Sequence, residues 1–379
     1  MEYDGKVFGK RLYAGYIHSR TVRDHGRVHF LSEIIYNTTD YILQYSPNSG
    51  TPKADYVRTL CSAVVQACTT TNVIQIVNST YPSPQYPRSI DIECSTEESA
   101  LAAAAYLGLD PLLERLVNDG VRDVRTYFGR PLMWAARRGN LEMTRLLLEK
   151  GFKIDIVEDL EEAARNGHDD ILRLLLDRTP DGYEIAIRAA ASGGHLDIIS
   201  NLMRHDSQAS AGKLWNRILF IAARHGQEQV ARMAIDEGAN PDFMLHPVCP
   251  LITPLDAAAK GGHLGVVKLL LTRGATLRPR RQANPLIHAI KSGWLAVAQY
   301  LIDHGAIVNP IKTHKELRPL NPWMTAIVHG QADMLRLLIK NGADVNLEPD
   351  ILKEAYYHVE AHGYAALMSI LHDSSGGAS

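Results

Sequence analysis

Glycine recurs at nearly regular intervals through the last three quarters of this 379-residue chain. Each of these glycines follows a run containing small residues and precedes an apolar stretch, usually rich in leucine, and they stand at Gly108, Gly139, Gly167, Gly194, Gly226, Gly262, Gly293, Gly330 and Gly363. The intervals run from 27 residues (194 minus 167) to 37 residues (330 minus 293). A repeat of about 33 residues that is predicted as helix, turn and helix is typical of a solenoid, in which each repeat packs against its neighbours.

The clearest copy of the repeat lies between residues 253 and 275. Thr253 can cap the first amide groups of a helix, and Pro254 loses no hydrogen bond at the first helical position. Gly262 can end that helix with a positive φ. A second helix follows, with apolar residues at helical spacing at Leu264, Val267, Leu270 and Leu271. Such a helix pair buries its apolar face only against the next pair.

The sequence resembles the ankyrin repeat family over roughly residues 97 to 372. The matching motifs are Thr253-Pro254-Leu255, the Gly-His pairs 167–168, 194–195 and 262–263, Gly151, Gly238-Ala239-Asn240, Gly305-Ala306-Ile307-Val308-Asn309 and Gly342-Ala343-Asp344-Val345-Asn346. The resemblance implies an all-α ankyrin-repeat solenoid of about eight to nine helix–turn–helix repeats with a helical N-terminal cap. The sequence departs from the family pattern around Gly167 and Gly194, where the repeats are short. These short repeats predict a less regular groove near residues 155 to 185.

The chain divides into three predicted segments. Residues 1–95 lack the repeat and have helical spacing at 32–45 and 54–81, with a break near 69–72, so we interpret them as a cap on the first repeat. A separate interaction module is the alternative for this segment. Residues 96–372 form the predicted array, and residues 373–379 a flexible tail.

Composition and motifs narrow the class of protein. A formal net charge of −2 argues against a general nucleic-acid binder. The longest apolar stretch, around residues 100–109, is too short to span a bilayer, and no secretory signal opens the chain. We therefore expect no nucleic-acid partner, no membrane contact and a cytoplasmic or nuclear location. Because no phosphate-binding loop, nucleophile elbow or paired metal-ligand motif appears, we also expect no cofactor and no metal.

The four cysteines are Cys61, Cys68, Cys94 and Cys249, and none forms a two-residue-spaced pair. Cys61 and Cys68 share a face of a predicted helix, and we interpret them as small buried apolar residues. A catalytic nucleophile or a redox pair is the alternative.

The residues just before each repeat glycine end the first helix of the repeat, and the resemblance implies that they point toward a concave groove. Five of the six central pairs, from Arg137-Arg138 to Lys291-Ser292, contain arginine or lysine. Stacking would align them into a basic stripe that attracts carboxylates or phosphates. The alternative is plain helix-end electrostatics, since a helix C-terminus favours cations. Trp134 and His288, one helical turn further up the first helix, are the predicted aromatic and histidine anchors. The predicted partner-binding residues are therefore Tyr106, Trp134, Arg137, Arg138, Arg165, Arg224, His225, Lys260, His288, Lys291 and His329.

Two functions remain open at this point. The first is a protein–protein interaction scaffold that presents the groove and two long connections, 240–253 and 309–322, to an acidic partner segment. The alternative interpretation of these two connections is that they are tolerated surface loops without a binding role. The second is a protein that binds an anionic small molecule, or an unorthodox acid–base enzyme, with histidines and cations in the same groove. The residues favour the noncatalytic scaffold.

Overall fold

The computed structural model describes residues 30–45, 51–67, 94–126, 128–205, 211–244, 252–277, 284–309, 321–346 and 349–375. Within these ranges the regular structure is helical, and the β-type pairing is an isolated bridge between Thr126 and Gly129. The chain separates into two compact units, Met1–Ala189 (unit 1) and Ala190–Ser379 (unit 2). The boundary falls inside helix α11, Tyr183–Gly193.

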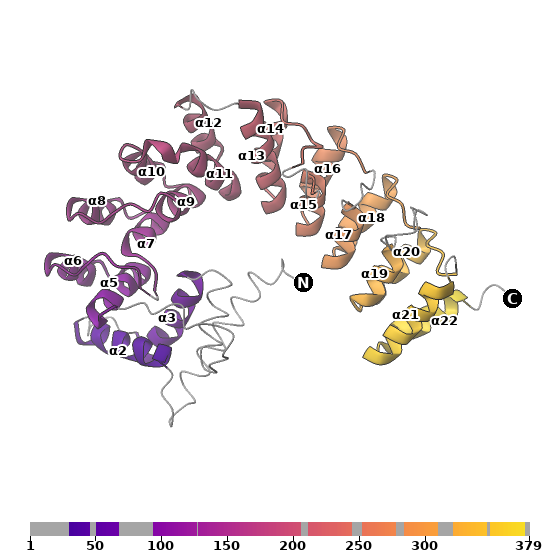
Figure 1. The fold of residues 1–379 in the computed structure, drawn as a ribbon, viewed down its shortest axis with the longest axis horizontal. Helices are drawn as coiled ribbons and strands as arrows, with labels where there is room; N and C mark the ends of the chain where they lie inside the picture. Colours follow the sequence, from indigo (N-terminus) through magenta and orange to yellow (C-terminus); the bar gives the residue numbers. More distant parts are fainter. Residues whose placement is uncertain are drawn as a thin grey trace. The chain divides into compact units, whose positions relative to one another are not determined.

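Unit 1 is built from helix pairs stacked in two layers (Figure 1). Its helices are α2 (Phe30–Tyr45), α3 (Lys53–Ala67), α5 (Thr96–Leu107), α6 (Asp110–Asn118), α7 (Pro131–Arg138), α8 (Leu141–Glu149), α9 (Glu158–Arg165), α10 (Asp169–Leu176) and the short 3-10 helix η1 (Pro180–Gly182). The first helices α5, α7 and α9 contact one another in sequence, and so do the second helices α6, α8 and α10. Helices α2 and α3 contact each other and α5, at the place predicted for a cap.

Unit 2 repeats the same arrangement (Figure 1). Its helices are α12 (Leu196–His205), α13 (Ala211–His225), α14 (Glu228–Asp236), α15 (Pro254–Gly261), α16 (Leu264–Thr272), α17 (Pro285–Ser292), α18 (Leu295–Asp303), α19 (Pro322–Val328), α20 (Ala332–Lys340), α21 (Pro349–His362) and α22 (Ala365–Ser375). The first helices α13, α15, α17, α19 and α21 contact one another in sequence. The second helices α14, α16, α18, α20 and α22 form the other layer.

The ends of the repeat helices follow the expected capping chemistry. Thr253 caps α15: its hydroxyl accepts from the Asp256 amide, and the Asp256 carboxylate accepts from the Thr253 amide. Gly262 ends α15 with φ 77°, a left-handed conformation that other residues adopt at a cost. Within each repeat, these caps fix where the first helix stops and therefore where its last-turn side chains lie.

A recurring contact locks neighbouring repeats together at these glycines. The residue directly after the glycine of one repeat extends its side chain over the glycine of the preceding repeat. There it donates a hydrogen bond to the carbonyl of the residue two positions before that preceding glycine. His168 donates to the Arg137 carbonyl at 3.0 Å, His263 to Arg224 at 3.1 Å and Trp294 to Lys260 at 3.0 Å. A methyl group on Gly139 would meet the His168 ring at 2.5 Å, so these positions have no room for a side chain. Two of these side chains, His168 and His263, belong to the Gly-His pairs noted in the sequence.

Several sequence predictions concern residues that the structure describes. The all-α solenoid is confirmed, and helix α2 agrees with the predicted helix at 32–45. Cys61 is buried, as interpreted from the sequence. Helix α22 extends to Ser375, three residues into the predicted tail. No helix within the described ranges is long and apolar enough to cross a membrane.

Other predictions lie outside the described residues. They concern the end of the predicted helix at 54–81, most of the two long connections, Cys68 and Cys249.

Candidate functional site

The predicted aromatic residues of unit 1 form a packed pair. The Tyr106 and Trp134 rings meet edge to face, with centroids 4.7 Å apart. The Trp134 side chain is 1% exposed, and its indole N–H donates to the carbonyl of Phe128, which is itself buried. The prediction of Trp134 as an exposed anchor is therefore wrong: it is a core residue, enclosed by Tyr106 and the segment before α7.

The predicted arginines of unit 1 are tied to groups of the same unit. Arg165 pairs with Glu161 at 2.9 Å and with Glu162 at 3.3 Å. Arg137 pairs with the same Glu162 at 3.7 Å, so one carboxylate of α9 links the two arginines. Arg138 reaches over Gly108 and donates to the Tyr106 carbonyl at 3.1 Å. The structure thus brings these arginines together but surrounds them with acceptors.

The first helices of unit 1 are acidic as a set. Helices α5, α7 and α9 carry three arginines (137, 138, 165) and six carboxylates (97, 98, 158, 159, 161, 162). Asp159 is fully buried, accepts from the Asp155 amide at 2.8 Å and lies 3.6 Å from the Arg130 guanidinium. Burial raises the pKa of Asp159 to about 7, although the Asp155 amide and Arg130 oppose the shift. A continuous basic stripe is therefore absent from the described first helices of unit 1.

The first helices of unit 2 that precede α21 have, as a set, the opposite charge. Helices α13, α15, α17 and α19 carry five lysines and arginines and one carboxyl group, that of Asp256, which is 1% exposed. We call the five cations, Lys213, Arg217, Arg224, Lys260 and Lys291, the cationic row. All are exposed except Lys260, which is partly exposed. Further along, α21 carries Asp350, Glu354 and Glu360.

Lys213 and Arg217 were missed by the sequence analysis, which considered the last turn of each helix. Their signal is nevertheless present in the sequence: Lys213, Arg217 and Arg224 are spaced by four and seven residues, which places them on one face of α13. The spacing extends the cationic surface along the length of α13, beyond the last turn.

The remaining predicted residues of unit 2 take different positions. The His288 side chain is 18% exposed, and its Nε2 lies 4.0 Å from Asp256 Oδ1 in the preceding repeat. His329 is exposed and its Nδ1 donates to the Thr325 carbonyl at 2.8 Å, while His225 is exposed at the end of α13. Trp294 is 40% exposed, and its indole N–H donates to the Lys260 carbonyl. Unit 2 therefore presents cations next to an exposed indole.

Two neighbouring groups of unit 2, His288 and Asp256, have shifted pKa values. Burial lowers the pKa of His288 to about 4, with further lowering by the charges of Lys291 and Lys260. Burial raises the pKa of Asp256 to about 6, opposed by its hydrogen bonds with Thr253. His288 is thus neutral at pH 7, and it lies between two ammonium groups and a carboxylate.

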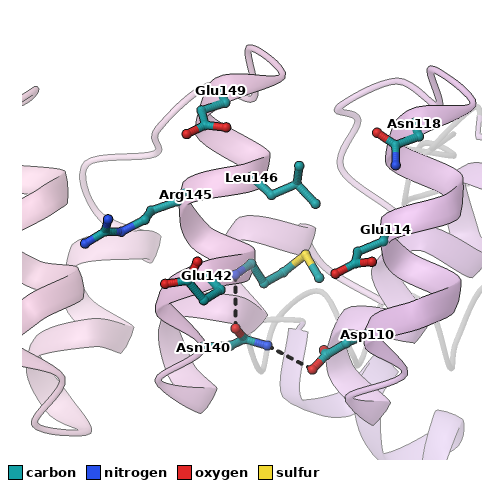
Figure 2. Close-up of a pocket in the computed structure, with 9 residues that line it drawn as sticks. Asp110, Glu114, Asn118, Asn140, Glu142, Arg145, Leu146 and Glu149 are labelled. Carbon is teal, nitrogen blue, oxygen red and sulfur yellow. Dashed lines mark hydrogen bonds between the residues drawn. The ribbon is translucent and has the colours of Figure 1, made fainter.

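A hollow of about 500 Å³ lies elsewhere, between α6 and α8 of unit 1 (Figure 2). It is lined by Asp110, Glu114, Asn118, Asn140, Glu142, Met143, Arg145, Leu146 and Glu149. Asn140 bridges its walls by donating to Asp110 at 3.1 Å and accepting from the Met143 amide at 3.0 Å. None of the predicted site residues lines this hollow, and its four carboxylates do not suit an anionic small molecule. No group of three or more metal-ligating side chains occurs within the described ranges.

Comparison with known proteins gives the family. A model of ankyrin repeats matches residues 64–158, 160–245, 189–281 and 255–349. The ankyrin repeat and KH domain-containing protein mask-1 of Caenorhabditis elegans is 27% identical over 299 residues, which are 75% of this chain and 10% of that protein. The transient receptor potential cation channel subfamily A member 1 homolog of Caenorhabditis elegans is 26% identical over 51% of this chain and 14% of its own length. The probable E3 ubiquitin-protein ligase XBOS32 of Oryza sativa is 27% identical over 39% of this chain and 38% of its own length.

The chain therefore aligns with less than two fifths of the length of each of these relatives. The family model itself covers most of the chain, from residue 64 to residue 349. The chain belongs to the ankyrin repeat family, whose domains generally act as protein–protein interaction scaffolds.

Proposed function

We propose that this ankyrin array binds an acidic polypeptide segment on the first helices of unit 2. The observation that carries the proposal is the cationic row: five lysines and arginines on α13, α15 and α17, with no exposed carboxylate on these helices or on α19. A surface of one sign attracts an oppositely charged partner and orients it during the encounter.

The repeat spacing suits an extended chain. Packed helices lie about 8–10 Å apart, and an extended polypeptide rises about 3.3 Å per residue. Lys260 and Lys291 occupy the same position in consecutive repeats, two residues before Gly262 and Gly293. An acidic residue at about every third position of an extended partner would therefore meet successive repeats.

Helix-end electrostatics account for part of the cationic row but not for all of it. Arg224, Lys260 and Lys291 lie in the last turn of their helices, where the macrodipole favours cations. Lys213 lies in the first turn of α13, where the macrodipole disfavours a cation. Lys213 thus supports a binding role, because the macrodipole does not favour a cation at that end of α13.

An exposed indole beside the cations favours a polypeptide over a simple anion. Trp294 is 40% exposed, and it is held by its hydrogen bond to the Lys260 carbonyl. Val328, on the next first helix, is 45% exposed. Tryptophan flanked by basic residues is a common anchor of protein interfaces, where it accepts an apolar side chain of the partner.

The proposal is tested with a short fluorescein-labelled peptide that has glutamate at every third position and glycine between. The test variant is Arg224→Glu/Lys260→Glu/Lys291→Glu in the full chain, with fluorescence anisotropy as the measurement. The matched control is Lys268→Glu/Arg336→Glu/Lys340→Glu, which makes the same change of net charge on the second helices α16 and α20. We expect the test variant to weaken peptide binding by about tenfold or more and the control by much less. Equal weakening in both variants would reduce the effect to net charge and refute the proposed surface.

A further inference from the structure

His288 connects two consecutive repeats of unit 2. It belongs to α17, and its Nε2 lies 4.0 Å from Oδ1 of Asp256 in α15. The other oxygen of Asp256, Oδ2, accepts from the Thr253 hydroxyl at 2.7 Å and the Thr253 amide at 3.0 Å. Oδ1 is buried and has no hydrogen-bond partner among the described residues. A buried carboxylate oxygen therefore faces an imidazole at a distance just beyond a hydrogen bond.

The charges around His288 come from few sources. Helix α15 contributes Asp256 and Lys260, and α17 itself contributes Lys291, one helical turn from His288. Helix α18 carries Tyr300 and Asp303 in its second half, and α19 has no titratable side chain but is followed by His329. Of these groups, Lys291 and Lys260 lower the pKa of His288, which burial lowers further still, to about 4. The ring is therefore kept neutral by its burial and by two nearby positive charges.

We propose that Lys260, His288 and Lys291 form a proton-linked carboxylate site, in which a bound acidic side chain is accompanied by uptake of one proton on His288. This inference rests on the proposed function of unit 2 and identifies where on the cationic row a partner carboxylate is recognised. The incoming carboxylate offsets the two ammonium charges that oppose protonation of the ring. The imidazolium then has Asp256 Oδ1 as its counter-ion, and that oxygen gains the partner that it lacks.

The site makes acidic-partner binding depend on pH in a defined direction. Because His288 is neutral in the free protein above pH 5 and protonated in the complex, binding strengthens as pH falls. If occupancy returns His288 to the ordinary histidine pKa of about 6.5, protonation of His288 alone makes affinity at pH 5.5 about tenfold higher than at pH 7.5. Any proton that Asp256, with a pKa of about 6, releases on becoming the counter-ion reduces this factor. Glutamate side chains of the peptide stay ionised over this range, so the ligand itself adds little.

The experiment measures proton uptake directly. The glutamate–glycine peptide is titrated into the full chain at pH 6 by calorimetry in buffers of different ionisation enthalpy. We expect the unmodified chain to take up less than about 0.7 proton per bound peptide, because His288 gains about that much while Asp256, whose pKa is about 6, releases part of a proton as it becomes the counter-ion. We expect His288→Gln to take up almost none, and His304→Gln, a matched change at the exposed end of α18, to behave as the unmodified chain. A parallel NMR titration of the His288 ring with and without peptide needs no variant, and we expect its pKa to rise on binding.

The outcomes separate this inference from the proposed function. Peptide binding without proton uptake, uptake that persists in His288→Gln, or an unchanged His288 titration would overturn the proton-linked site and leave the acidic-segment proposal standing. Absence of peptide binding at every pH between 5.5 and 7.5 would overturn both.

Discussion

The first helices of units 1 and 2 have the same place in the repeat but opposite electrostatic character. In unit 1, Arg137 and Arg165 share Glu162, and six carboxylates accompany three arginines on α5, α7 and α9. In unit 2, five cations accompany the single buried carboxyl of Asp256 on α13, α15, α17 and α19. A basic residue before a repeat glycine is therefore surrounded by carboxylates in unit 1 and accompanied mainly by other cations on these helices of unit 2. Its neighbours three to four residues away, and one repeat away, decide whether it offers charge to a partner.

The largest expected effect separates the two tryptophans that stand beside these surfaces. Trp134→Ala should lower the free energy of unfolding by about 3–5 kcal/mol, because a buried ring is replaced by a cavity. Trp294→Ala should cost about 1–2 kcal/mol, since the ring is 40% exposed and loses chiefly one hydrogen bond. Urea unfolding followed by circular dichroism measures both. Equal costs would contradict the assignment of one ring to the core and the other to the surface.

A second effect concerns pH and the buried acid of unit 1. The folded pKa of Asp159, about 7, lies above its unfolded value near 4, so the folded state holds the proton more tightly. The stability of α9 should therefore fall as pH rises between these values. Relative to the unmodified chain, Asp159→Asn should gain about 2 kcal/mol between pH 5 and pH 7.5. Hydrogen exchange of the α9 amides at the two pH values measures this gain, and a difference that does not change with pH would show that burial does not control this carboxyl.

A smaller effect on peptide affinity is expected when two carboxylates are removed from α9 of unit 1. Glu161→Gln/Glu162→Gln removes two carboxylate partners of Arg165 and one of Arg137. Introduced into the variant Arg224→Glu/Lys260→Glu/Lys291→Glu, it should restore peptide affinity by about two- to fivefold, as expected for released surface pairs. The same two substitutions at Glu142 and Glu149 of α8 serve as the control. If both pairs of substitutions restore binding equally, the carboxylates of α9 do not mask a binding surface.

The fold could be predicted because each repeat carries its own local signals. Thr253 and Pro254 start a helix, Gly262 ends it, and leucines at helical spacing mark the buried face, so no long-range information is needed. The ion pair of Arg165 with Glu161 could also have been predicted, since the two residues are four apart on one helix.

The candidate site could be predicted only in part because its charges depend on contacts between repeats. The burial of Trp134 follows from Tyr106 in the preceding first helix, α5, and from Phe128 before α7. The Arg137–Glu162 pair and the approach of His288 to Asp256 both join neighbouring first helices. Their distances depend on the stacking register, which a position in the repeat does not specify.

The most direct test of the account is to find where an acidic segment binds. The glutamate–glycine peptide is coupled to the full chain with a carbodiimide, which joins carboxylates to nearby lysines without a spacer, and the coupled lysines are identified by mass spectrometry. We predict coupling at Lys213, Lys260 and Lys291 of unit 2, suppressed by an excess of unlabelled peptide. Coupling concentrated at Lys150 and Lys153 of unit 1, or spread evenly over all exposed lysines, would contradict the claim that unit 2 holds the acidic-segment surface.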